Sequence, residues 1–389
     1  MNEIYVALFN ISLFILLAEV VRAFLSRYNL PQLVGEILVG ILVSFLALVI
    51  NPVLGYSLIG LNDFVIFIAE FSILLLIFTS GMEHGIAPIK SSGLFGFLGA
   101  TLGALLPFFA GYMIYSKSLG ESSALFIGTS LGATSLAALI SIIETEKLKG
   151  GPIDFLFSSA AVDDVVDFLL LSTVLTVVQG EKLTLFQFGF KIATLVLIWV
   201  IILLASLYFV PRISNRVSEN YLIEFSFVVL FGLVLLMISL GYAPIIAAFV
   251  AGVAFAESYK TEKIKEINNV LLGVFGSIFF VTVGAEVNLH ELNVGVLLLS
   301  LELTAIAFIF KWLGVFPFAY AKFKDFKKAN FVAIGMTPRG ETGLVIASIG
   351  ISMGVINNEE FGSLVFMAIL TTLIGSVAFK YLTKRVNLN

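Results

Sequence analysis

Residues 158–167 read SSAAVDDVVD and place three carboxylates within five positions of an otherwise apolar run. Asp163 lies about ten residues from the start of the surrounding apolar run, 153–179. This distance corresponds to a depth of roughly 15 Å in a helix. A charged side chain at the centre of a membrane helix costs about 2.5–3.5 kcal/mol on insertion scales. The cluster therefore indicates either carboxylates that buried basic residues neutralise for packing only or a functional site inside a membrane.

The composition favours a membrane protein. Of the 389 residues, 59% are hydrophobic and 12% are charged, whereas a soluble domain carries about 25% charged residues. The mean hydropathy of +1.08 agrees. A net charge of −4 gives no indication of nucleic-acid binding, and the absence of cysteine excludes thiol redox chemistry and cysteine metal sites. Two histidines, His84 and His290, are too few and too scattered for a histidine-rich metal centre.

Apolar runs long enough to cross a hydrocarbon core, about 20 residues each, recur along the whole chain. They are continuous rather than alternating, which argues against a β-barrel. We therefore predict an all-α polytopic membrane protein with about thirteen transmembrane helices and no cleaved signal peptide. Whether the short run at 243–258 is a full crossing is left open. The predicted spans are 4–25, 30–50, 60–82, 93–116, 123–143, 153–179, 186–210, 221–241, 243–258, 268–286, 294–320, 329–354 and 361–383.

Loop charge predicts the orientation. Of the 22 lysines and arginines, 17 lie at the C-terminus and at the connections after the odd-numbered spans 1 to 11, whereas only Lys117 and Lys182 lie on the other side. Cytoplasmic connections collect such residues. The N-terminus is therefore expected outside and the C-terminus in the cytoplasm, in a multi-pass plasma membrane protein.

Weak internal similarities keep their order along the two halves. Phe78–Glu83 matches Val281–Glu286 in its Thr, Gly and Glu at an offset of 203 residues, and Pro31 matches Pro244 at an offset of 213. Gly132–Leu136 matches Gly340–Leu344 at an offset of 208. These matches favour a duplication of spans 2–6 as spans 9–13. Partners lie seven spans apart, so the halves must run in opposite directions, as in the inverted repeats of secondary transporters.

The carboxylate cluster suits competition between a proton and a small cation. Burial and an adjacent carboxylate both favour the protonated form of an aspartate, and carboxylate oxygens also suit Na⁺. Lys311 in the eleventh span is the natural counter-ion of Asp163 and Asp164. The alternatives are a purely structural charge cluster, most plausible for Asp167, and a lysine that reaches the membrane surface.

Two spans contain helix-breaking residues at matching positions of the proposed repeat. Residues 336–343 read MTPRGETG, and residues 128–135 read GTSLGATS. Paired interruptions of this kind indicate the binding site of a transporter, because irregular backbone at membrane depth is tolerated only around protein or a watery cavity. We predict Thr134 and Ser135 as cation ligands. Arg339 and Glu341 are accessory residues or an intramembrane ion pair, and Asp167 is a third candidate accessory residue.

In these residues the chain resembles the monovalent cation:proton antiporter family, in the branch of Kef-type and NapA-type exchangers. The resemblance covers nearly the whole length and rests on an ordered set of motifs. They are residues 30–40, Phe78–Glu83, Ala133–Ser135, Val162–Asp164, Ala247–Ser258, Ile278–Gly284, Lys311 and Pro338–Glu341.

The resemblance implies an NhaA/NapA-like fold with two crossing unwound helices. It implies a dimerisation part at about 1–90 and 221–290, a linker helix at about 186–210, and an ion-transporting core at about 93–179 and 294–385. It also implies a homodimer in which Asp164 binds the cation and exchanges protons, while Asp163 pairs with Lys311. Asp167 departs from the family pattern, in which a non-acidic residue is expected.

We therefore predict a Na⁺(Li⁺)/H⁺ antiporter that works by alternating access, with no resident cofactor and no enzymatic activity. A Kef-type K⁺/H⁺ antiporter is the first alternative, and the lack of a nucleotide-sensing domain weakens it. A sodium-coupled organic anion symporter and an ion channel are further alternatives. A membrane-embedded hydrolase is disfavoured because no His or Ser accompanies the aspartates at a triad-like spacing.

Overall fold

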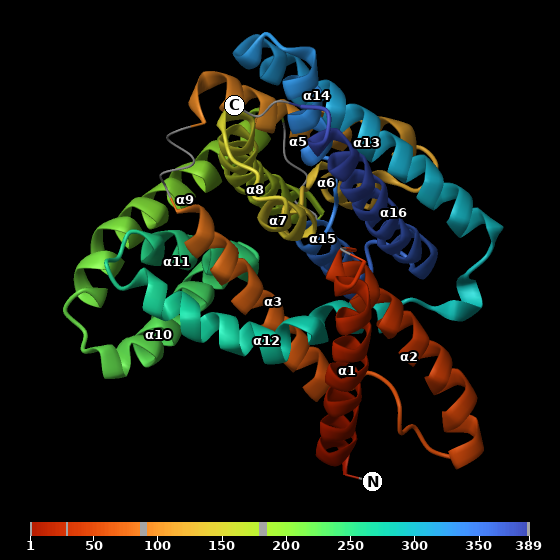
Figure 1. The fold of residues 1–389 in the computed structure, drawn as a ribbon. Helices are drawn as coiled ribbons and strands as arrows, with labels where there is room; N and C mark the ends of the chain where they lie inside the picture. Colours follow the sequence, from red (N-terminus) through yellow and green to blue (C-terminus); the bar gives the residue numbers. More distant parts are fainter. Residues whose placement is uncertain (1, 29, 86–91, 179–184, 387–389) are drawn as a thin grey trace. The chain divides into compact units, whose positions relative to one another are not determined.

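The computed structural model describes residues 2–28, 30–85, 92–178 and 185–386, and every regular element in these ranges is a helix. The predicted all-α fold is confirmed (Figure 1). The long helices are α1 (Glu3–Ser26), α2 (Gln32–Leu54), α3 (Asp63–His84), α5 (Gly93–Tyr115), α8 (Gly151–Val178), α9 (Leu185–Ser214), α10 (Leu222–Ser239), α12 (Thr261–Ala285), α13 (Val294–Phe323) and α16 (Asn358–Thr383). The short α-helices are α6 (Glu121–Gly132), α7 (Ala137–Thr145), α11 (Pro244–Ala256), α14 (Phe326–Gly335) and α15 (Glu341–Ser352).

Nine helices of the described ranges are long and apolar enough to cross a membrane. The other predicted spans differ in ways that the sequence explains. The sixth is the 28-residue α8, whose aspartates lower its hydropathy. The ninth is the 13-residue α11, which begins with Pro244. The fifth and twelfth are each divided into two short helices, α6 with α7 and α14 with α15.

Helix starts follow local capping chemistry. Asn357 caps α16 and forms a capping box with Glu360, in which each side chain accepts a hydrogen bond from the other's backbone N–H. Asp325 accepts hydrogen bonds from the first backbone N–H groups of α14, and Asn293 does the same for α13. Polar residues in the short connections therefore determine where the apolar helices begin.

The chain divides into two compact units, and the larger contains Met1–Glu70, Ser92–Asp167 and Ser277–Asn389. Within it α13 packs along α5, α14 and α16, and α6 packs on α5 and α15. Figure 1 shows α13, α14 and α16 gathered together, with α15 beside α16. A buried apolar cluster, with Leu156, Phe331 and Phe379 at its centre, holds these helices together.

The smaller unit contains Phe71–Ser91 and Phe168–Gly276. Here α11 packs against α9 and α10, and its eleven buried residues leave it without a polar face. Phe249 of α11 lies 5.2 Å from Phe168, measured between ring centroids. A helix that is apolar on all sides is one that is buried in protein or lipid.

Glycines allow close helix crossings in both units, as one example from each shows. A methyl group on Gly40 would lie 2.1 Å from the carbonyl oxygen of Val281 and 2.7 Å from Cα of Gly284. A methyl group on Gly252 would lie 2.1 Å from the carbonyl oxygen of Phe78 and 2.9 Å from Cα of Gly81. Only glycine permits backbones to approach so closely.

Candidate functional site: a charged cluster at two helix breaks

The interruptions predicted in the fifth and twelfth spans are both present. Helix α6 ends at Gly132, and Ala133 adopts an extended conformation (φ −59°, ψ 145°). Helix α14 ends at Gly335, and α15 begins only at Glu341. Pro338 lies between them and lacks the backbone N–H that a continuous helix would need.

The two interruptions contact one another directly. The backbone N–H of Ser135 donates a 2.9 Å hydrogen bond to the carbonyl of Pro338. The hydroxyl of Thr134 donates to the carbonyl of Met336 at 3.2 Å. Backbone groups that each helix leaves unpaired are therefore partly satisfied by the other segment, which is how irregular backbone is tolerated in a membrane.

Gly340 provides the space for this contact. A methyl group there would lie 2.5 Å from Oγ and 2.6 Å from Cβ of Ser135. The backbone of Gly340 (φ −143°, ψ −124°) is not in the left-handed region, so the requirement is for space. The glycine predicted as a helix breaker therefore also allows the two interruptions to approach.

Asp163 of α8 and Lys311 of α13 form a fully buried ion pair. Nζ of Lys311 lies 2.6 Å from Oδ1 of Asp163, and both side chains have 0% exposure. The same Nζ donates a 2.7 Å hydrogen bond to the carbonyl of Gly132, the last residue of α6. A cation placed at the carboxyl end of a helix is stabilised by the helix dipole. Lys311 therefore joins Asp163 to the first helix break.

The other two aspartates of the cluster differ from Asp163. Asp167 is fully buried, and neither of its carboxylate oxygens has a hydrogen-bond partner among the described residues. Its Oδ1 lies 3.4 Å from the position that a methyl group on Gly132 would occupy. Asp164 is 8% exposed, so it is the member of the trio with some access to solvent.

Arg339 and Glu341 bind different partners. The guanidinium of Arg339 donates hydrogen bonds to the carbonyls of Met336 and Thr337, and to that of Ala307 in α13. Glu341 accepts a 2.6 Å hydrogen bond from the hydroxyl of Ser135. The two residues thus do not form the ion pair that the sequence left open. Arg339 instead holds the twelfth-span interruption in shape, and Glu341 connects it to the fifth-span interruption.

Two residues that sequence reasoning did not select also hold the crossing. The hydroxyl of Ser130 donates to the carbonyl of Gly343 at 2.9 Å. The hydroxyl of Thr372 in α16 donates to the carbonyl of Arg339. Adjacent threonines at positions 371 and 372 of an apolar span are a weak signal that could have identified the second contact.

The family of the chain follows from its sequence. Residues 12–385 match the protein family "Sodium/hydrogen exchanger, transmembrane". The chain belongs to the sodium/hydrogen exchanger family. The predicted membership among monovalent cation:proton antiporters is thereby confirmed, and the coarse expectation of a multi-pass membrane transporter rather than an enzyme agrees with it.

Named relatives of this exchanger match over nearly their whole lengths. A Na⁺/H⁺ antiporter of Enterococcus hirae is 28% identical over 96% of this chain and 98% of its own. The Na⁺/H⁺-K⁺ antiporter GerN of Bacillus cereus is 27% identical over 96% and 95%. The structure of the sodium proton antiporter MjNhaP1 from Methanocaldococcus jannaschii superposes with a TM-score of 0.77 at 15% identity, over 97% of this chain and 96% of that one. This likeness confirms the antiporter fold of the exchanger.

Proposed function

We propose that this exchanger moves Na⁺, and Li⁺ as a second substrate, in one direction across the membrane while H⁺ moves in the other. The observation that carries the proposal is a cluster of buried charges placed where two interrupted helices cross. The names of the relatives support Na⁺/H⁺ exchange. GerN is named for K⁺ as well, so K⁺ is a comparison ion in the test.

Asp164 is the proposed group for which Na⁺ and H⁺ compete. It is the aspartate of the cluster with measurable exposure, 8%, and it neighbours Asp163, whose Oδ1 is already paired with Lys311. When Asp164 is protonated it is neutral, so a bound Na⁺ would be an uncompensated positive charge in a buried site. When Asp164 is ionised, the cation neutralises it. One site that takes either cation but not both produces exchange.

Thr134 and Ser135 are proposed to complete the cation site. Each hydroxyl gives its hydrogen to another group, Thr134 to the carbonyl of Met336 and Ser135 to Glu341. The lone pairs of both hydroxyl oxygens are then the groups left to face a cation. The hydrogen bonds across the crossing therefore orient the ligands as well as supporting the backbone.

Alternating access is proposed for the movement. In this scheme the core at about 93–179 and 294–385 moves against a dimerisation part at about 1–90 and 221–290, with the helix at about 186–210 as linker. Two copies of the chain form a homodimer in the plasma membrane, with the N-terminus outside. The contacts Gly40–Gly284 and Gly252–Gly81 support the inverted duplication behind this scheme, because the repeat relates Gly81 to Gly284 at an offset of 203 residues and each of these two glycines makes a close contact with another glycine.

Everted membrane vesicles with a pH-sensitive dye test the proposal. Respiration acidifies the vesicle interior, and addition of NaCl or LiCl should release protons from vesicles that carry the wild-type chain. The Asp164→Asn variant should give no release. Asp154→Asn is the matched control, because Asp154 is an exposed residue in the first turn of the same helix.

Three outcomes contradict the proposal. They are absence of a Na⁺ response in the wild type, full exchange by Asp164→Asn, and loss of exchange by the Asp154→Asn control. A response to KCl that exceeds the responses to NaCl and LiCl would assign the chain to K⁺/H⁺ exchange by the same site.

A further inference from the structure

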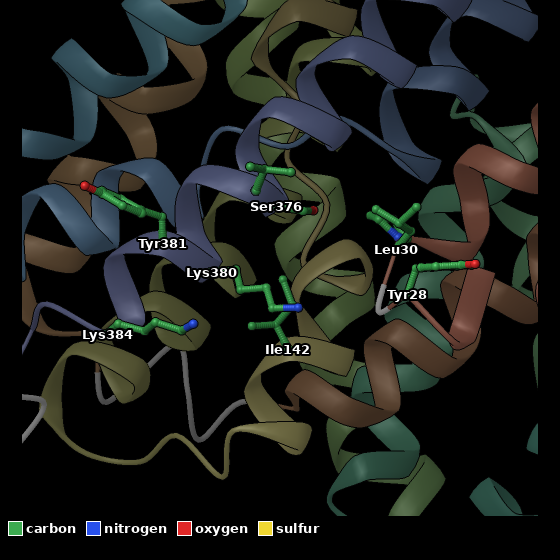
Figure 2. Close-up of a pocket in the computed structure, with 9 residues that line it drawn as sticks. Tyr28, Leu30, Ile142, Ser376, Lys380, Tyr381 and Lys384 are labelled. Atoms are coloured by element: carbon green, nitrogen blue, oxygen red, sulfur yellow. The ribbon is translucent and has the colours of Figure 1, made fainter.

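A cavity of about 310 Å³ lies in the larger unit, away from the aspartate cluster. Three segments that are distant in sequence line it: the connection between α1 and α2, helix α7, and the last two turns of α16 (Figure 2). The Lys380 side chain extends toward Ile142 of α7, and Leu30 faces it from the opposite wall.

The cavity has a cationic wall. Lys380 and Lys384 both line it, and no aspartate or glutamate does so among the described residues. No ion pair of either lysine is found within the described part of the chain. Lys380 lies in the last turn of α16 and Lys384 caps it, so the helix dipole offsets part of this charge. A hollow with this charge repels Na⁺ and attracts an anion.

Apolar and aromatic residues also line the cavity. Leu30, Pro31, Ile142 and Val377 provide hydrocarbon surface, and Tyr28 and Tyr381 add aromatic rings that end in hydroxyls. Tyrosine favours the boundary between hydrocarbon and headgroups. A free inorganic anion would use the lysines but not the apolar residues, whereas a phospholipid would use both.

We propose that this cavity binds the phosphate headgroup of an acidic phospholipid, with Lys380 and Lys384 as the charged contacts. Basic pockets between transmembrane helices on the cytoplasmic side suit such headgroups. The loop charges place this end of α16 in the cytoplasm. In the proposed orientation the cavity therefore faces the cytoplasmic leaflet of the membrane.

The wall of the cavity is mechanically connected to the helix crossing. Ser376 lines the cavity and donates a 3.4 Å hydrogen bond to the carbonyl of Ala138 in α7. One residue earlier, a methyl group on Gly375 would lie 2.9 Å from Cγ of Pro338, so α16 presses against the twelfth-span interruption. A bound lipid would therefore hold together α7 and α16 next to both interruptions. Its expected effect on exchange rests on the proposed function, whereas its binding does not.

Lipid binding is measured on the purified full-length chain in detergent, to which phosphatidylglycerol or phosphatidylcholine is added. Native mass spectrometry then counts the lipids that each protein molecule retains. The wild type should retain phosphatidylglycerol in preference to phosphatidylcholine. The Lys380→Ala/Lys384→Ala variant should bind phosphatidylglycerol roughly 30-fold more weakly, since each membrane-proximal lysine contributes about fivefold.

Two further variants separate charge at this cavity from charge in general. Lys322→Ala/Lys327→Ala removes the same charge from exposed positions outside the cavity and should leave retention unchanged. Lys380→Arg/Lys384→Arg keeps the charge and should restore retention, which also shows that loss in the alanine variant is not misfolding. Equal retention by the wild type and the Lys380→Ala/Lys384→Ala variant overturns the proposal, as does an equal loss in the Lys322→Ala/Lys327→Ala control.

A second arm distinguishes the lipid from free phosphate. The proposal is overturned if inorganic phosphate stabilises the wild type against heating while no phosphatidylglycerol is retained. That result would show an anion site that is not a lipid site. The dye assay in liposomes of the two compositions then tests regulation separately. Because lipid retention is counted without transport, a failure of Na⁺/H⁺ exchange would leave the binding result intact.

Discussion

Removing either partner of the Asp163–Lys311 pair should destabilise the protein far more than removing both. Both side chains have 0% exposure and lie 2.6 Å apart. Loss of one partner leaves the other as an uncompensated buried charge, which costs about 3–5 kcal/mol. Replacement of the whole pair by neutral groups of similar size is often nearly neutral.

The expected changes in melting temperature follow from chain length. With an unfolding entropy of about 2.1 cal/mol/K per residue, a chain of 389 residues loses about 1.2 °C for each kcal/mol. Lys311→Gln and Asp163→Asn should therefore each lower the melting temperature by about 4–6 °C. The double variant should lose only about 1–3 °C, because glutamine can still donate to the carbonyl of Gly132 and to the new asparagine.

The assay is size-exclusion chromatography of heated, purified protein in detergent and in Na⁺-free buffer, so that no bound cation stabilises the folded state. The four proteins form a double-mutant cycle, which isolates the energy that the two residues share. A double variant that loses the sum of the two single losses, about 8–12 °C, would refute the reasoning. The pair would then be two independent side chains rather than one unit.

Two other perturbations test the crossing and the unexplained aspartate. Gly340→Ala should abolish dye-monitored exchange while the protein still inserts, because the new methyl group would lie 2.5 Å from Oγ of Ser135. In the matched control Gly232→Ala nothing lies within 4 Å of the added methyl group, so this variant should gain up to about 1 kcal/mol of helix stability. Equal activity of both variants would contradict the steric argument. Asp167→Asn should keep the fold and retain Na⁺/H⁺ exchange, unlike Asp164→Asn. Neither oxygen of Asp167 has a hydrogen-bond partner in the described ranges, and removal of a buried charge removes its desolvation cost. Loss of exchange in a normally folded Asp167→Asn protein would instead make Asp167 part of the transport machinery.

Much of the fold could be predicted because a membrane restricts the choices. The apolar run length, the need to satisfy every backbone group and the helix-breaking residues at 336–343 and 128–135 are all local properties. They predicted an all-α chain with two interrupted spans, and both interruptions are present. Run length was a poor guide to the number of long crossings, since α8 carries aspartates and α11 has only 13 residues.

The partners of individual side chains were harder to predict. Lys311 and Asp163 are 148 positions apart, and their pairing was reached from the rarity of buried charges together with the resemblance to a family. The contacts of Arg339 with three carbonyls could not be anticipated, because a guanidinium near Glu341 in sequence suggests an ion pair. The cavity at Lys380 has no sequence signal beyond the basic residues at the end of the last span and directly after it.

The sequence by itself determined that this chain belongs to the sodium/hydrogen exchanger family, that three carboxylates lie within one apolar run, and that two of its spans break. These properties depend on residue type and spacing within single segments. Only the tertiary structure decided that the two breaks hydrogen-bond to each other, that Lys311 bridges Asp163 and Gly132, and that Arg339 and Glu341 bind different partners. A buried polar group takes whichever partner the packing of distant helices brings within 3 Å, and spacing along one chain segment does not contain that information.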